Sequence, residues 1–200
     1  MYTLISGSPK VVSSNSLYFL NIIKEKIGSH VLYELKKDNY SDIIDNIKLS
    51  HTIVLAFPLY VDSPTSITLK FLDYIIDNKI NIEGKNIYVV INCGFREGEQ
   101  NITACNVIKR WCEKTKCVYK GSIMIGAGEI VGKSQYKFIS KKALKKLNEF
   151  SSCIINRGKC SDIVTTMDYL NNKIYCYMAN SSWTKKCKKN KLSKKDVRAQ

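Results

Sequence analysis

The sequence has no long apolar run, no close cysteine pair and only two histidines, and each absence removes a class of protein. No stretch approaches the roughly 20 apolar residues that a membrane span needs, so we expect none. The N-terminus, MYTLISGSPK, has no basic region before its apolar run and does not resemble a secretion signal. We therefore expect a cytoplasmic protein.

The eight cysteines are spread along the chain without a CxxC pair; they stand at positions 93, 105, 112, 117, 153, 160, 176 and 187. Zinc sites and iron–sulfur clusters need closely grouped thiolates, so this spacing argues against both. Without an export signal, a disulfide framework is not expected either. We expect no metal site, and we interpret the cysteines as small buried hydrophobic residues plus a few surface thiols.

Acidic residues are scarce in the last third of the chain. Residues 131–200 hold 17 Lys/Arg and 4 Asp/Glu, a net charge of +13, whereas residues 1–130 hold 15 and 13, a net of +2. The segment Lys185–Arg198 alone carries eight positive charges. Such a tail either binds a polyanion or is simply solvated. Because no aromatic interleaving or nucleic-acid module accompanies it, we expect no nucleic-acid partner, although the basic tail leaves that reading open.

Strand-like and helix-like segments alternate along the chain. Apolar runs predict strands at 2–6, 30–35, 52–57, 86–92 and 118–126. Helical spacing predicts helices at 16–27, 42–49, 66–77, about 99–115, 139–155 and 167–189. This alternation predicts an α/β fold, a three-layer, doubly wound, five-stranded parallel sheet. We expect one domain at 1–160, and a basic C-terminal helical extension at 161–200 packed on the same domain.

Three loops follow predicted strands at the edge where open α/β sheets bind ligands. The first, SGSPKVVSSNS (6–16), is rich in serine and opens into a helix, whose N-terminus suits a phosphate monoester. It lacks GxGxxG, which disfavours a Rossmann dinucleotide site. The second, FPLYVDSPTS (57–66), offers aromatic and apolar groups to a flat heterocycle. In the third, NCGFREGEQN (92–101), Gly94 and Gly98 permit close backbone approach to a ligand. A plain serine-rich connection and a satellite of the core remain the alternatives.

Taken together, these loops resemble a known family. GSPKVVSSNS resembles the GSPR-x-x-S-x-N phosphate loop of flavodoxin-like, NAD(P)H-dependent FMN reductases. PLYVDSPTSITLKFLDYI resembles the second flavin loop and following helix of that family, P-x-Y-x-x-S-x-P-x-x-x-K-x-F-x-D. NCGFREGEQN resembles the segment that lies along the isoalloxazine, and the ending W-x₄-KKNKLSKKD is similar to some bacterial members. The resemblance implies a flavodoxin-like sheet of order 2-1-3-4-5.

The resemblance also implies a cofactor and its contacts. It implies FMN as cofactor and NAD(P)H as co-substrate, with hydride passing through the flavin to a small acceptor such as a quinone, nitroaromatic, metal or second flavin. It further implies a homodimer. The implied contacts are Ser8, Lys10, Ser14, Asn15 and Ser16 around the phosphate, Pro58, Leu59, Tyr60 and Val61 along the ring or ribityl chain, and Asn92, Cys93, Gly94 and Phe95 at the other ring edge.

Two departures from the family pattern and the absence of an obvious acid–base group refine this expectation. Lys10 stands where arginine is common, so a bidentate phosphate contact is lost. No cysteine-bearing insertion is present, so we expect FMN alone. Because the flavin carries the chemistry, no catalytic side chain is assigned, and Tyr60 is the best candidate for shaping the substrate pocket. His30 and His51 are expected near the amino ends of strands, in structural roles.

Two rival functions use the same scaffold. A flavodoxin-type electron carrier needs an acidic face for basic partners, and the net charge of +15 has the wrong sign. A non-enzymatic polyanion-binding protein is the other rival, because fold alone does not determine function. Both rank below the reductase.

The stretch AGEIVGKS (127–134) resembles the end of a nucleoside-triphosphate phosphate loop. Ala127 stands where the strict pattern has glycine, and the stretch follows the fifth strand rather than the first. We therefore do not expect triphosphate binding here. We expect instead that Gly126 and Gly128 let this loop pass close to the cofactor or nicotinamide, and Gly128 joins the expected cofactor contacts.

Overall fold

The computed structural model describes residues 1–10, 14–132, 137–167, 171–193 and 196. The chain divides into two compact units, Met1–Thr166 and Met167–Gln200. The expected division after residue 160 and the packing of the extension on the first unit stay predictions.

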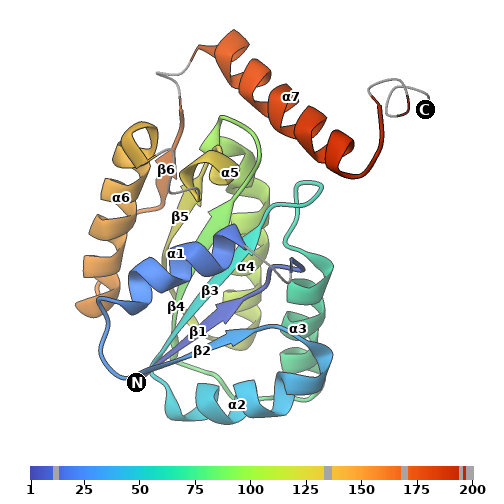
Figure 1. The fold of residues 1–200 in the computed structure, drawn as a ribbon. Coiled ribbons are helices and arrows are strands. Elements are labelled where there is room, and N and C mark those ends of the chain that lie inside the picture. Colours follow the sequence, from blue (N-terminus) through green and yellow to red (C-terminus); the bar gives the residue numbers. More distant parts are fainter. Residues whose placement is uncertain (11–13, 133–136, 168–170, 194–195, 197–200) are drawn as a thin grey trace. The chain divides into compact units, whose positions relative to one another are not determined.

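The first unit is built on a single parallel sheet of order β2-β1-β3-β4-β5-β6 (Figure 1). Its strands are β1 (Tyr2–Ser6), β2 (His30–Glu34), β3 (Thr52–Pro58), β4 (Asn86–Asn92), β5 (Val118–Ile125) and β6 (Ile163–Thr165). The predicted doubly wound, flavodoxin-like α/β fold is confirmed. The predicted count of five strands is wrong, because β6 adds a sixth at the edge beside β5.

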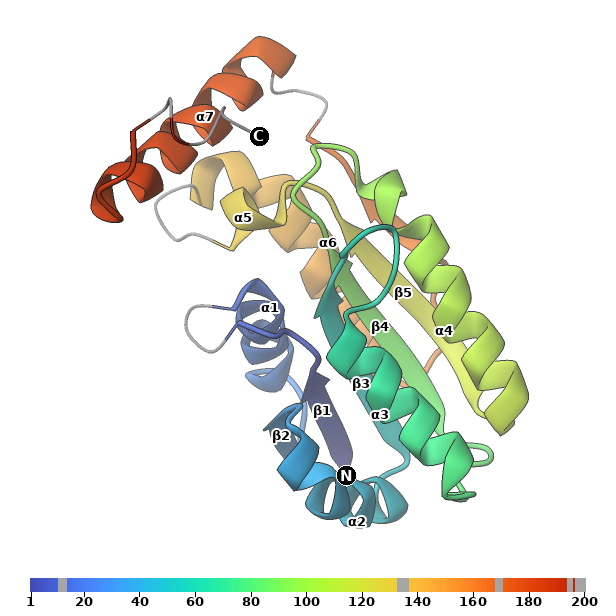
Figure 2. The ribbon, with the colours of Figure 1, turned by 90° about the vertical axis from the view of Figure 1, so that its right-hand side faces the viewer.

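Helices cover both faces of this sheet. They are α1 (Asn15–Lys24), α2 (Tyr40–Leu49), α3 (Ser66–Asp77), α4 (Ile102–Thr115), the short α5 (Gly128–Val131) and α6 (Lys137–Ile155), with 3₁₀ turns η1 (Lys37–Asn39) and η2 (Gly98–Asn101). Figure 2 shows α1 on one face and α3 and α4 on the other. Apolar side chains of α2, α3 and α4 form one core cluster with the sheet, for example Ile47, Phe71 and Ile108 against Leu55 and Val89. On the other face, Phe150 of α6 meets Tyr88 edge to face.

The central strands are buried along their length, because helices cover both faces of the sheet. In β4, the side chains from Ile87 to Asn92 are all buried, as expected of a strand covered by helices on both faces. In the described part of the second unit, the long helix is α7 (Asn172–Lys189). Within the described residues, every helix is too short or too polar to cross a lipid bilayer.

One expectation about cysteines is wrong in detail. A disulfide joins Cys153, near the end of α6, to Cys160, before β6. The turn between these elements brings the two Cα atoms to 6.3 Å, within the range a disulfide can bridge. A spacing of seven residues carries no recognisable sequence signature, so the pairing depends on this turn.

Candidate functional site

The loops that leave β1, β3, β4 and β5 meet at the carboxyl edge of the sheet and are tied to one another by hydrogen bonds. The Leu59 N–H donates to the Asn92 carbonyl at 2.8 Å, and the Gly128 N–H donates to the Cys93 carbonyl at 2.8 Å. The Thr65 hydroxyl donates to the Gly7 carbonyl at 2.6 Å. The four loops therefore form one continuous frame, at the edge where open parallel sheets bind ligands.

The loop after β1 presents the features that a phosphate requires. Ser14 caps α1, because its hydroxyl accepts from the Leu17 N–H at 3.3 Å. The Ser8 hydroxyl accepts from the Lys10 N–H at 3.3 Å, and the Lys10 side chain is exposed. The first N–H groups of α1 have no partner within the helix and favour an anion. Residues 11–13 lie outside the described residues.

Asn92, at the end of β4, is a buried hub rather than an exposed contact. Its amide donates to the Ser16 hydroxyl at 3.0 Å and to the Phe57 carbonyl at 3.3 Å. A side chain added at Gly128 would come within 2.9 Å of the Asn92 amide oxygen. Asn92 thus joins the start of α1 to the ends of β3 and β4. Its side chain leaves room only for glycine at position 128, the first residue of α5. Direct contact of FMN with Asn92 or Ser16 stays a prediction.

Asn15 makes a similar close contact. Its amide oxygen lies where a side chain at Gly132 would be, so α1 and the end of α5 approach each other across a glycine. Ala127, before α5, adopts a left-handed conformation with φ of 52°. Lys133 and Ser134, the end of the phosphate-loop-like stretch, lie outside the described residues.

The buried side chain of Cys93 contacts the backbone of the loop that follows β4. Its thiol is directed to the carbonyls of Glu97 at 3.5 Å and Phe95 at 3.6 Å, and it accepts from the Asn101 amide at 3.4 Å. Burial is the main reason that the pKa of the Cys93 thiol is raised, so the group is neutral at pH 7. Gly94 and Phe95 are exposed above it. This part of the loop offers a flat ring the aromatic side chain of Phe95 beside a glycine without a side chain.

The loop after β3 carries a tight turn with exposed apolar side chains. Tyr60 and Ser63 exchange backbone hydrogen bonds of 3.0 and 3.1 Å, and the two residues between them have positive φ, 49° for Val61 and 55° for Asp62. This is a type I′ turn, which normally selects glycine or asparagine. A β-branched residue in this region is strained, and such strain gathers at functional sites. Val61 is 97% exposed and Tyr60 is exposed beside it.

Sequence reasoning missed the support that β6 gives to the loops after β4 and β5. The Gly126 N–H donates to the Thr165 carbonyl at 2.9 Å, and the Gly98 N–H donates to the Thr166 hydroxyl at 3.2 Å. A side chain at Gly126 would collide with the Arg96 carbonyl. These glycines therefore let the loops pack on one another. Contact of Gly128 with the cofactor stays a prediction.

Asp162 fixes β6 to the rest of the sheet. Its carboxylate accepts from the Tyr119 hydroxyl at 2.5 Å, from the Ser122 hydroxyl at 2.9 Å and N–H at 3.1 Å, and pairs with Lys109 at 2.7 Å. Burial opposes the charge, but the hydrogen bonds from Lys109, Tyr119 and Ser122 outweigh it and lower the pKa of Asp162. No sequence pattern predicts this cluster, because its members come from α4, from β5 and from the residues just before β6.

The predicted contacts fall into two groups. Lys10, Tyr60, Val61, Gly94 and Phe95 are exposed at the edge, with Asn15, Pro58 and Leu59 half-buried; Ser8, Ser14, Ser16, Asn92, Cys93 and Gly128 are buried. His30 begins β2 and His51 precedes β3, so both histidines lie at the amino edge, as predicted. In the described part of the chain, no three His, Cys, Asp or Glu side chains cluster to hold a metal.

A separate cavity of about 580 Å³ lies between η1, the start of α2, and α3. Its lining residues are Lys37, Tyr40, Ser66, Ile67, Lys70, Asp73, Tyr74, Asp77 and Asn78. None of the predicted flavin contacts lines it. The loop frame is the better candidate, because it gathers helix N-termini and exposed aromatic groups at the carboxyl edge.

Comparison with solved structures shows the same fold. A NADPH-quinone reductase from P. pentosaceus is 17% identical with a TM-score of 0.60, covering 76% of this chain and 97% of that one. An FMN-dependent NADH-azoreductase from Bacillus anthracis, in complex with FMN, is 15% identical with a TM-score of 0.55, covering 78% and 99%. A Streptococcus pneumonia flavodoxin is 12% identical with a TM-score of 0.56, covering 78% and 99%. No family model and no curated protein matches the sequence.

Proposed function

We propose that this protein is an FMN-dependent NAD(P)H oxidoreductase that passes electrons to a small acceptor. The observation that carries the proposal is the loop frame, in which a serine-lined helix N-terminus and the exposed side chains of Tyr60, Val61 and Phe95 share one edge of the sheet. A phosphate suits the first and a flat apolar ring suits the second. Solved structures of this fold, some in complex with FMN, support the same assignment.

The residues present fit FMN. Bound FMN would supply the chemistry, accepting hydride from a reduced nicotinamide and passing electrons on. Lys10 would hold the phosphate as a point charge, together with the N–H groups that begin α1. Tyr60 and Val61 would cover part of the ring, and Gly94 and Phe95 would border its other edge. Asn92 acts behind these contacts by keeping their loops in register.

No acid–base residue is assigned, because bound FMN would carry the chemistry. The described loop residues that face solvent at this edge include the aromatic and apolar side chains of Tyr60, Val61 and Phe95, the lysine Lys10 and the carboxylates of Asp62, Glu99 and Glu129, and both histidines lie at the opposite edge. The protein's task is therefore to place the ring and leave one side open to two successive small substrates. A homodimer and a cytoplasmic location belong to the same proposal, and light scattering of the eluted protein tests the dimer.

The test is to titrate the purified protein with FMN and then add NADPH or NADH without air. We expect FMN to bind and its visible absorbance to bleach, and to return when a quinone is added. Lys10→Ala should weaken FMN binding about tenfold through the lost charge–phosphate contact, whereas Lys37→Ala, an exposed lysine of η1, should not. Protein that neither binds FMN nor bleaches it disproves the proposal, and bleaching only by a partner reductase favours an electron carrier.

A further inference from the structure

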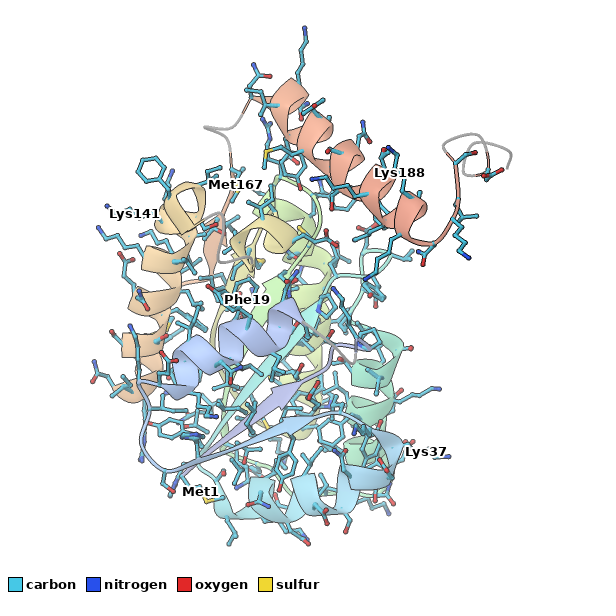
Figure 3. The ribbon with its side chains drawn as sticks, in the orientation of Figure 1. Met1, Phe19, Lys37, Lys141, Met167 and Lys188 are labelled. Carbon is cyan, nitrogen blue, oxygen red and sulfur yellow. A yellow bond between two sulfur atoms is a disulfide. The ribbon has the colours of Figure 1, made fainter. Side chains whose placement is uncertain are left out.

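A covalent link lies just before the last strand of the sheet. The disulfide joins Cys153, in the last turn of α6, to Cys160, three residues before β6 begins. α6 lies beside β6 at one side of the sheet (Figure 1), and Lys141 near the start of this helix is labelled in Figure 3. Phe150 and Ile154 of α6 are fully buried, so the helix is packed firmly on the sheet. The disulfide therefore ties the approach to β6 to a well-packed element.

Cys160 also lies directly against the neighbouring strand β5. Its N–H donates to the Lys120 carbonyl at 2.6 Å. A side chain at Gly121 would come within 2.7 Å of the Cys160 carbonyl, and the φ of Gly121 is 143°, which favours glycine. The register between β4 and β5 shifts beside this point, between Ile87 and Tyr88. The irregularity and the glycine together make room for Cys160 at the edge of the sheet.

β6 itself has few other anchors. It is three residues long, pairs in the described sheet with β5, and leaves Val164 37% exposed. Its other anchor is Asp162, which is bonded to Tyr119, Ser122 and Lys109. A short edge strand with little buried surface opens locally more often than the inner strands. The disulfide and Asp162 are therefore the two ties that keep the start of β6 in place.

β6 in turn supports two loops of the frame at the carboxyl edge. The Thr165 carbonyl accepts from the Gly126 N–H at 2.9 Å, and the Thr166 hydroxyl accepts from the Gly98 N–H at 3.2 Å. The same hydroxyl donates to the Glu99 carboxylate at 2.8 Å. If β6 separates from β5, these three hydrogen bonds are lost. The disulfide is thus connected to the loop frame through β6.

The disulfide can open and close within the folded protein. Cys153 and Cys160 are half-buried rather than enclosed, and the exposed Lys159 precedes Cys160 directly. A cationic neighbour stabilises a thiolate and so favours exchange with another thiol. The Tyr88 hydroxyl donates to the Gly158 carbonyl at 2.7 Å, which holds the turn between the two cysteines without the sulfur–sulfur bond. The strands β2, β1, β3, β4 and β5 pair with one another without β6, so the main core does not depend on the disulfide.

We propose that Cys153 and Cys160 form a reversible thiol–disulfide switch that sets how often β6 and the loop frame open. A dithiol attacks one sulfur as a thiolate and forms a mixed disulfide, and its second thiolate then releases the protein. The bond between the two protein sulfurs breaks, a disulfide forms in the reductant, and Cys153 and Cys160 gain two electrons and two protons. The effect on FMN rests on the proposed function, whereas the effect on β6 does not.

The first experiment measures backbone hydrogen exchange of the full chain without FMN, before and after reduction by dithiothreitol. We expect exchange at residues 163–166, Gly98 and Gly126 to become about tenfold faster or more, because the closed ring of residues 153–160 no longer restrains the opened segment. Exchange in β2 and α2, at the other side of the sheet, should not change. Unchanged exchange at β6, or equal acceleration in β2 and α2, overturns the proposal.

Two double variants identify the responsible thiols. Cys153→Ser/Cys160→Ser should show fast exchange at β6 with or without dithiothreitol. Cys176→Ser/Cys187→Ser removes two cysteines of α7 that are free in the structure, and it should keep the wild-type response. A response to dithiothreitol that survives in the first variant, or disappears in the second, overturns the proposal.

The second experiment follows the release of FMN after dilution, as the rise in fluorescence of the free flavin. Because release through an opened frame scales with how often the frame opens, we expect it to be about tenfold faster from the reduced protein. Cys153→Ser/Cys160→Ser should release FMN quickly under both conditions. Equal release from the two forms of the wild type, together with faster exchange at β6, overturns the proposed control of the frame. Protein that binds no FMN in either form disproves the proposed oxidoreductase, while exchange at β6 still decides the switch.

Discussion

If Asn92 holds the loop frame together, replacing Asn92 should both destabilise the protein and weaken FMN binding. Asn92→Ala deletes the hydrogen bonds to Ser16 and to the Phe57 carbonyl and leaves the buried Ser16 hydroxyl without its donor. At about 1 kcal/mol for each of the two hydrogen bonds and about 1–3 kcal/mol for a stranded buried group, we expect a loss of roughly 3–5 kcal/mol in the free energy of unfolding. Ser16→Ala should cost less, about 1 kcal/mol, because Asn92 keeps its bond to Phe57.

A double-mutant cycle with urea unfolding isolates the pair. The two changes together should cost about 2–4 kcal/mol less than the sum of the single changes, since the shared hydrogen bond is lost only once and the double variant has no stranded Ser16 hydroxyl. The control is the buried pair of Thr3 and Ser50, whose hydroxyls lie 2.7 Å apart towards the amino edge. Thr3→Val should also destabilise but leave the FMN dissociation constant unchanged, whereas Asn92→Ala should raise it. A coupling near zero, or equal effects of both variants on FMN, would refute the reasoning.

Three further predictions concern the turn and the β6 edge. Val61→Gly should raise the free energy of unfolding by about 1 kcal/mol in thermal or urea melts, because glycine relieves the left-handed strain, and should weaken FMN binding through loss of the apolar side chain. Asp162→Asn should lower stability by about 1–3 kcal/mol at pH 7. The folded pKa of Asp162 is depressed, so the stability that its carboxylate contributes is present above the unfolded pKa of about 3.9 and disappears as pH falls through the folded pKa. A stability difference between variant and wild type that persists undiminished at the lowest pH would contradict this. Cys153→Ser should lower the free energy of unfolding by about 2 kcal/mol. A reducing agent should destabilise the wild type by a similar amount and leave the variant unchanged, and a wild type that does not respond to reductant would contradict this.

The parts of the fold that the sequence predicts best are long, continuous and apolar. β4 and α3 begin and end at the predicted residues, 86–92 and 66–77, because a fully buried strand and a helix with a buried face leave clear periods. β6 escapes prediction because it has three residues and an exposed Val164. The four residues of α5 are too few to show a helical period.

The site is predictable in place but not in detail. Loop positions follow from the strand order, so the sequence points to the right edge of the sheet. The sequence does not reveal which loop side chains are buried. Asn92, Ser16 and Cys93 are buried and hydrogen-bonded, Asn92 to Ser16 and Cys93 to Asn101, as buried polar groups require. The support from Thr165 and Asp162 is equally hidden, since it depends on a strand pairing between distant segments.

Hydrogen exchange with and without FMN tests the central claim most directly, because it locates the ligand without assuming an activity. We expect FMN to slow backbone exchange at the loops after β1, β3, β4 and β5, around residues 7–10, 58–63, 93–98 and 126–132. Exchange along α2 and the later turns of α3, beside the cavity near Lys37 and Tyr74, should not change. Protection confined to that cavity, or no protection at any loop of the frame at saturating FMN, would contradict the account.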